Sequence, residues 1–105
     1  MEIIINEKKF NLDIADNFFK RLIGLMGKKN IQKGLFFPKT GSIHTFFMQE
    51  KIDIIMLDKK MQVIYYQSDV PRNKIIIQRK AYYTIELPKN SLKDIKKINK
   101  FEIIY

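Results

Sequence analysis

Residues 34–58 read GLFFPKTGSIHTFFMQEKIDIIMLD, and this stretch determines the fold class expected of the chain. The segment ends in IDIIMLD, residues 52–58, which is apolar at nearly every position before its last. Such a run is typical of a central strand that is covered on both faces of a sheet. The shorter apolar segment at residues 34–37 is stopped by Pro38, because proline has no N–H for a sheet ladder. The stretch therefore predicts a β-rich core.

Short β-prone segments continue on both sides of this stretch. Residues 2–5 and 9–14 are separated by Asn6-Glu7-Lys8, a spacing that predicts a tight antiparallel hairpin. A second hairpin is expected between residues 52–57 and 61–67, which flank a polar turn. Further extended segments are expected at residues 43–48, 74–79, 82–87 and 101–105.

Two helices are expected between these strands. Apolar residues recur at helical spacing from Phe18 to Met26, and Asp16 and Gly27 are suitable ends, so one amphipathic helix is predicted there. Gly24 inside it would cost about 1 kcal/mol relative to alanine, which suggests that another backbone approaches closely. A weaker helix is predicted over residues 91–98, where Ser91-Leu92-Lys93-Asp94 is similar to a capping box.

The composition is that of one folded domain spanning residues 1–105. The hydrophobic fraction of 46% fills a core and the charged fraction of 30% solvates its outside, which excludes disorder. The elements predict a mostly β (α+β) fold: a compact small β-barrel or curled sheets of seven to eight short strands with one amphipathic helix.

The residue types that are absent exclude several classes of site. The chain has no cysteine and one histidine, so disulfides, thiol nucleophiles, iron–sulfur clusters and the usual zinc sites are excluded, and no cofactor is expected. It has no Gly-rich phosphate loop, GxSxG motif or HExxH motif. No secretory signal and no apolar run of about 20 residues is present, so the expected location is the cytoplasm.

The chain is basic, with 20 lysines and arginines against 11 acidic residues and a net charge of +9. Such a balance raises the question of nucleic acid or an anionic membrane as partner. Nearly all of the positive charge is lysine, and isoleucine and asparagine are also abundant, as an AT-rich genome would produce. Nucleic-acid binding is therefore not favoured.

His44, Asp53 and Glu86 are the candidates for chemistry, and each has two interpretations. His44 is either an acid, base or anion donor, or a core histidine bonded to a backbone carbonyl. Asp53 lies within an apolar run, where an unpartnered carboxylate costs several kcal/mol. It either caps the turn from Met48 to Ile52 or holds the segment of His44, or it serves a pocket. Alternation places Glu86 beside Thr84, either on a solvated strand face or in the same pocket.

Four blocks, taken in order, resemble the domain of unknown function family 192. They are RLIGLM at residues 21–26, GLFF at 34–37, HTFFM with IDIIMLD at 44–58, and IELP at 85–88. The resemblance implies a compact, mostly β domain without an established activity, and hints at an accessory role beside secretion or pilus machinery. The family's polar or motif positions correspond to Arg21, His44, Thr45, Met48, Asp53, Asp58 and Glu86.

The leading hypothesis is a non-enzymatic module that binds a small ligand or a protein partner. Its pocket would be formed by Arg21, His44, Thr45, Asp53 and Glu86, while Phe47, Met48 and Met56 are expected in the core. The alternative is a hydrolase or acid–base enzyme that pairs His44 with Asp53 or Glu86. A basic barrel that binds nucleic acid is the third hypothesis, and it requires exposed tyrosines beside lysines at Tyr65, Tyr66, Tyr82 and Tyr83.

Overall fold

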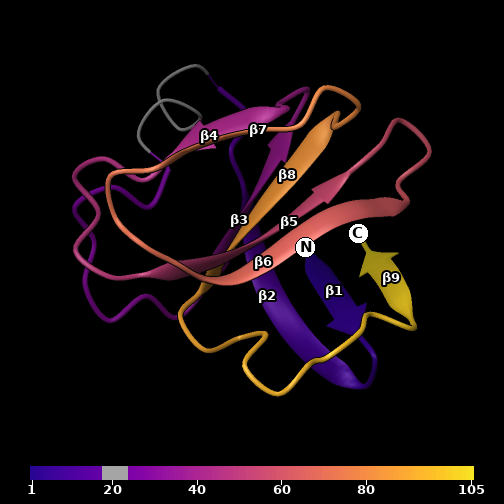
Figure 1. Ribbon diagram of the computed structural model, residues 1–105. Helices are drawn as coiled ribbons and strands as arrows, with labels where there is room; N and C mark the ends of the chain where they lie inside the picture. Colours follow the sequence, from indigo (N-terminus) through magenta and orange to yellow (C-terminus); the bar gives the residue numbers. More distant parts are fainter. Residues whose placement is uncertain (18–23) are drawn as a thin grey trace.

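Nine strands make up the fold in the computed structural model, which describes residues 1–17 and 24–105. The strands are β1 (Glu2–Ile5), β2 (Lys8–Ile14), β3 (Gly34–Pro38), β4 (Ser42–His44), β5 (Ile52–Leu57), β6 (Val63–Val70), β7 (Ile75–Ile77), β8 (Tyr83–Pro88) and β9 (Phe101–Ile104). Seven of them form one curled half-barrel sheet in the order β6-β5-β8-β3-β2-β1-β9, and β4 and β7 form a separate two-stranded ribbon (Figure 1). The prediction of a mostly β fold with curled sheets is confirmed, with nine described strands where seven to eight were expected.

β5 lies inside the sheet and is buried along its whole length. It pairs antiparallel with β6 on one side and with β8 on the other. Its side chains alternate between the two faces of the sheet. Ile52, Ile54 and Met56 face one way, and Ile55 and Leu57 face the other. Burial on both faces explains why residues 52–57 lack the polar alternation of a half-exposed strand.

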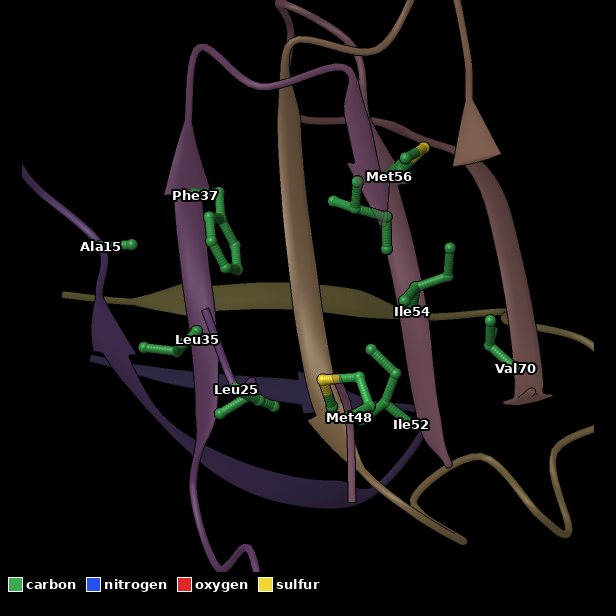
Figure 2. Close-up of a cluster of buried hydrophobic side chains, with 10 residues drawn as sticks. Ala15, Leu25, Leu35, Phe37, Met48, Ile52, Ile54, Met56 and Val70 are labelled. Carbon is green, nitrogen blue, oxygen red and sulfur yellow. The ribbon is translucent and has the colours of Figure 1, made fainter. Parts of the chain in front are cut away.

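Each face of the sheet carries its own apolar cluster. The first cluster consists of Ala15, Leu25, Leu35, Phe37, Ile43, Met48, Ile52, Ile54, Met56 and Val70 (Figure 2). The second cluster consists of Ile3, Ile5, Leu12, Phe36, Ile55, Leu57, Ile85, Leu87 and Leu92.

The ribbon of β4 and β7 covers part of the first cluster. Ile43 of β4 is buried in that cluster, and its register partner, Ile76 of β7, packs against it. Because side chains alternate along a strand, the neighbouring residues project from the outer face of the ribbon. The outer face carries Ser42, His44, Ile75 and Ile77.

The predicted helix over residues 16–27 is not supported by the described residues, none of which forms a helix. Residues 18–23, at its centre, lie outside the described part of the chain. Its predicted last turn is wrong, because residues 24–27 form a turn and the φ of 55° at Gly24 cannot continue an α-helix. Gly27 does have the left-handed conformation expected of it, with φ of 75°, but it ends this turn rather than a helix. The neighbour that requires glycine at position 24 is the side chain of Glu86 rather than a second backbone.

The second predicted helix, over residues 91–98, is also wrong. Residues 89–94 form successive turns, in which the N–H groups of Lys93 and Ile95 bond to carbonyls three residues earlier. The N–H of Leu92 is held instead by the carboxylate of Asp53, at 2.6 Å. This bond ties the segment to the sheet, and the bonds at Lys93 and Ile95 form separate turns that do not extend into a helix.

Candidate functional site

Asp53 is fully buried on the face of the sheet that carries the second cluster. Its Oδ1 accepts a hydrogen bond from the N–H of Asp69 at 2.7 Å, and its Oδ2 accepts one from the N–H of Leu92 at 2.6 Å. Both carboxylate oxygens are thus engaged by backbone, as a buried charge requires. The side chain ties the end of β6 and the turn after β8 to β5.

Glu86 lies on the opposite face of the same sheet. Its neighbours Ile85 and Leu87 belong to the second cluster, whereas its register partners are Leu35 and Ile54 of the first. The side chain is only 4% exposed, which excludes the solvated strand face. Among the described residues, Oε1 of Glu86 has no hydrogen-bond partner.

Burial dominates the acidity of Glu86. Loss of hydration raises the pKa of its carboxyl to about 7, and a hydrogen bond from the backbone of Leu25 opposes this to a lesser extent. Near neutral pH the group therefore exists in both protonation states inside the core.

The turn at residues 24–27 joins this buried carboxyl to the surface. A Cβ placed on Gly24 would lie 3.0 Å from Oε1 of Glu86 and 3.3 Å from the ring of Phe37. At the other end of the turn, the N–H of Gly27 donates to the carbonyl of Phe47 at 3.0 Å. The carboxyl and Phe47 are thus connected through one short backbone segment.

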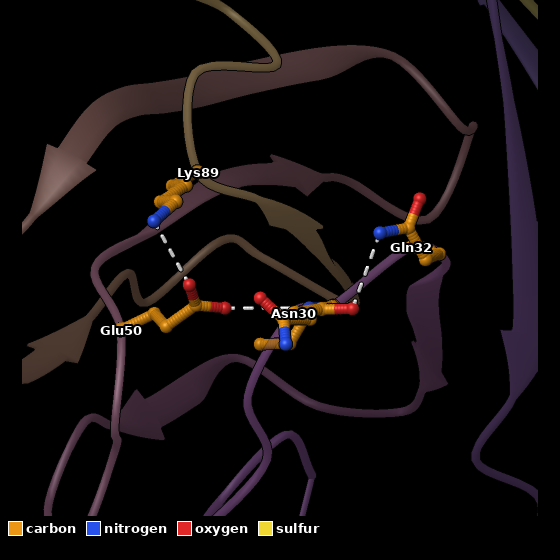
Figure 3. A network of polar contacts seen from close by, with 5 residues as sticks. Asn30, Gln32, Glu50 and Lys89 are labelled. Carbon is orange, nitrogen blue, oxygen red and sulfur yellow. Dashed lines mark hydrogen bonds and ion pairs between the residues drawn. The ribbon is translucent and has the colours of Figure 1, made fainter.

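A surface pocket of about 310 Å³ lies beside this turn, between Leu25, Leu35 and residues 28–34. Glu86 is not among the described residues that line it. Glu50 holds the loop that forms its rim: the carboxylate accepts the N–H of Ile31 at 3.3 Å and pairs with Lys89 at 2.9 Å (Figure 3). The hydrogen bond from Lys89 and that from Ile31 lower the pKa of Glu50. Sequence reasoning missed Glu50, which gives no signal beyond interrupting an apolar run.

His44 projects from the outer face of the ribbon and is partly exposed. Its Nδ1 accepts a hydrogen bond from the N–H of Phe46 at 3.2 Å, and the two ring centroids lie 5.5 Å apart. His44 is therefore not the core histidine of the second interpretation, and the hydrogen bond of its ring is to a backbone N–H rather than to a backbone carbonyl. Its hydrogen bonds within the described chain include no carboxylate.

Exposed apolar side chains lie next to His44 in the ribbon or in the sequence: Ile75 is its register partner, the ring of Phe46 contacts it, and Phe47 follows directly after Phe46. We call His44, Phe46, Phe47, Ile75 and Ile77 the ribbon surface. Phe47 is 76% exposed, and Ile75 and Ile77 are 62% and 65% exposed. The predicted core position of Phe47 is therefore wrong, whereas those of Met48 and Met56 are confirmed. Four of the eight exposed large apolar residues in the described chain belong to the ribbon or to the two residues that follow Thr45, so exposed apolar side chains are concentrated in this part of the chain.

Thr45, Met48 and Asp58 have structural contacts. The hydroxyl of Thr45 donates to the carbonyl of Pro71 and accepts the N–H of Lys74, each at 2.8 Å. Met48 packs in the first cluster. Asp58 accepts the N–H groups of residues 60 and 62 and so shapes the turn between β5 and β6.

The seven predicted site residues thus occupy separate places. Asp53 and Glu86 lie on opposite faces of the sheet, His44 lies on the outer face of the ribbon, and Arg21 lies outside the described residues. In the described part of the chain, no three acidic or histidine side chains gather closely enough to hold a metal ion.

The tyrosines do not form the exposed row that nucleic-acid binding requires. All four are half-buried. Tyr83 stacks on Phe36 with centroids 5.4 Å apart, and Tyr82 packs edge-on against Tyr83 at 5.0 Å. Their rings are engaged within the protein. Along residues 1–17 and 24–105, no helix has the length and apolar character to cross a membrane.

Comparison with known proteins identifies the family. The family model DUF192, described as an uncharacterized ACR, matches residues 1–100. The chain belongs to the DUF192 family. The resemblance seen in the sequence blocks is thereby confirmed.

Relatives of this DUF192 chain carry the name UPF0127. The UPF0127 protein of Pyrococcus horikoshii is 38% identical over 105 residues, which span 90% of each chain. That of Thermococcus sibiricus is 40% identical over 81 residues, covering 71% of this chain and 53% of its own.

Two solved structures share the fold of this DUF192 chain. A protein of unknown function from Novosphingobium aromaticivorans has a TM-score of 0.79 at 14% identity, covering 98% of this chain and 84% of its own. A putative transcription regulator from Sinorhizobium meliloti has a TM-score of 0.78 at 15% identity, with coverage of 96% and 89%. At such identities the likeness establishes the fold alone.

Proposed function

We propose that this DUF192 chain is a binding module for a protein partner and that the ribbon surface is its contact site. The observation that carries the proposal is the exposure of three large apolar side chains, Ile75 and Ile77 on the outer face of the ribbon that carries His44 and Phe47 just after that ribbon's first strand. Aromatic and branched apolar side chains that gather on a surface are typical of the centre of a protein interface.

The backbone at Phe47 supports the proposal independently of exposure. Its φ of 63° lies in the left-handed region, which costs a residue other than glycine about 1 kcal/mol. The ring of Phe47 is 76% exposed, so its burial within the chain does not offset this cost. Strained backbone that presents an exposed aromatic ring is the arrangement expected of a binding residue.

The contacts of the candidate groups favour binding over acid–base catalysis. A general base needs an accessible proton acceptor within hydrogen-bond reach of its substrate. The Nδ1 of His44 is engaged by the N–H of Phe46, and both oxygens of Asp53 are engaged by backbone. Glu86 is enclosed in the core on the face away from Asp53. The described contacts thus supply no carboxylate–imidazole pair.

Site-specific photo-crosslinking in the cell that makes the protein tests the proposal. Phe47→benzoylphenylalanine places the reactive ring on the ribbon surface, and Ile64→benzoylphenylalanine places it at an exposed apolar position on β6 as a matched control. We expect a discrete protein adduct at position 47, absent at position 64 and lost when Ile77→Ser is added. Equal adducts at both positions, or none at position 47, would contradict the proposal.

A further inference from the structure

The outer edge of β7 is open for strand pairing. In the ribbon, the N–H of Thr45 bonds to the carbonyl of Lys74 at 2.8 Å, and the N–H of Gln78 bonds to the carbonyl of Gly41 at 3.0 Å. Hydrogen-bonded and non-hydrogen-bonded pairs alternate along an antiparallel ladder. With the register Ser42↔Ile77 and His44↔Ile75, the backbone groups of Ile75 and Ile77 therefore point away from β4.

No described residue occupies that edge. β7 pairs with β4 alone, and none of the hydrogen bonds between described residues outside the ladder involves the backbone of Ile75 or Ile77. Two N–H donors and two carbonyl acceptors thus have no hydrogen-bond partner among the described residues, next to the exposed side chains of the same two residues. Such an edge is a template for an added strand.

The two end strands of the seven-stranded sheet, β6 and β9, carry features that discourage pairing. β6, at one end of the sheet, has register shifts against β5 between Ile52 and Ile54 and between Met56 and Leu57, which distort its edge. β9, at the other end, carries Glu102, which pairs with Lys100 at 3.2 Å. Irregularity and charge are common protections of edge strands. β7 consists of three isoleucines and has neither.

The charges around β7 indicate which residues a partner strand would carry at its two ends. Exposed cations flank it on both sides: Arg72 and Lys74 precede it, and Arg79 and Lys80 follow it. None of the four forms an ion pair with a carboxylate among the described residues. An acidic segment would therefore be attracted at both ends of β7.

We infer that the outer edge of β7 accepts an extended peptide segment of a protein partner, with alternating apolar residues in its middle and acidic residues at its ends. The inference rests on the proposed function and names the partner class of the same surface. Main-chain bonds to Ile75 and Ile77 supply the pairing, and the exposed isoleucines and Phe47 take the partner's apolar side chains.

Selection from a random peptide display library on the purified full chain tests the inference. We expect enrichment of peptides that alternate apolar and polar residues and end in aspartate or glutamate. Hydrogen exchange at the amides of Ile75 and Ile77 is expected to slow at least about tenfold on binding such a peptide. Failure to enrich any peptide, or enrichment without alternation and without protection of these amides, would overturn the inference.

Two variants at one position separate strand pairing from apolar contact. Ile77→Pro removes an outward N–H that β4 does not use, while Ile77→Ser keeps the N–H and removes the apolar side chain. Strand addition predicts that each weakens binding of the selected peptide by about tenfold or more. If Ile77→Ser weakened peptide binding and Ile77→Pro did not, strand pairing would be overturned, while the proposal that the ribbon surface is the contact site would stand. Unchanged binding in both would overturn the inference and contradict the proposed function. If Ile77→Pro does not fold, the slowing of hydrogen exchange at the amides of Ile75 and Ile77 in the unaltered chain still tests strand pairing.

Discussion

Oε1 of Glu86 lies 3.0 Å from the position that a Cβ on Gly24 would occupy. The glycine has φ of 55°, and the carboxyl beneath it is buried without a described partner for that oxygen. A backbone conformation that glycine adopts readily and a buried acid therefore meet at this position. The backbone of the next residue, Leu25, donates a hydrogen bond to the same carboxyl and so ties the turn at residues 24–27 to the first cluster.

The first prediction concerns this turn. Gly24→Ala is expected to lower the free energy of unfolding by about 2 kcal/mol, because alanine disfavours positive φ and its methyl group would crowd Glu86 and Phe37. Gly27→Ala is the matched control: φ there is 75° but nothing lies within 4 Å of a Cβ, so about 1 kcal/mol is expected. Urea denaturation of both variants gives the comparison. Equal losses would show that the contact with Glu86 contributes nothing.

Glu86 should also make stability depend on pH. Burial raises the pKa of its carboxyl from 4.5 to about 7, so between these values the folded state binds more protons than the unfolded state. The free energy of unfolding then falls as pH rises through this window, by about 3 kcal/mol from this group. Below pH 4.5 the penalty is absent, and above pH 7 it is fully present.

Glu86→Gln isolates that contribution, because the amide has similar shape and does not titrate. We expect the stability of the variant relative to the unaltered chain to increase between pH 5 and pH 8. Denaturant midpoints measured across this range provide the test, and titration of other groups cancels in the difference. A difference that is constant with pH would mean that Glu86 titrates at its ordinary value in the folded protein.

The sequence predicted the sheet well because its signals are local. The apolar run at residues 52–57 and the hairpin spacing after Leu57 each report directly on strand pairing. Alternation also correctly placed Thr84 and Glu86 on one face, opposite Ile85 and Leu87. It could not show whether that face was solvated, because burial depends on the segments that the chain brings over it.

The errors at residues 24–27 and 91–98 have the same physical origin. Helical spacing of apolar residues was present in both segments, but each also packs against a buried carboxylate of a distant strand, which the spacing does not report. Glu86 lies against Gly24, and Asp53 takes the N–H of Leu92. Phe47 was likewise expected in the core, whereas its ring is 76% exposed at a residue with φ of 63°.

Asp53 provides the third prediction. Asp53→Ala would leave the buried N–H of Leu92 and that of Asp69 without acceptors, so a loss of about 3 kcal/mol or more is expected. Amide hydrogen exchange at these two residues should accelerate beyond the change in global stability. Asp58→Ala is the control, since its hydrogen bonds are at an exposed turn and about 1 kcal/mol is expected there. Unchanged exchange at residues 69 and 92 would contradict the role assigned to Asp53.

The last prediction tests whether Phe47 is retained for binding rather than for stability. Asparagine tolerates the left-handed region better than phenylalanine, and the ring of Phe47 buries little surface in the free protein. Phe47→Asn should therefore leave the free energy of unfolding unchanged or raise it by up to about 1 kcal/mol. Phe37→Ala, at a ring that is 2% exposed, should lower it by about 4 kcal/mol. Chemical denaturation gives both values.

If Phe47→Asn destabilised the chain by more than about 1 kcal/mol, the ring would have a packing role in the monomer, because loss of an exposed ring alone changes stability by less than that. A variant that is as stable as the unaltered chain yet fails to bind its partner would separate the two roles, since only the interface would then account for an aromatic side chain at a strained position.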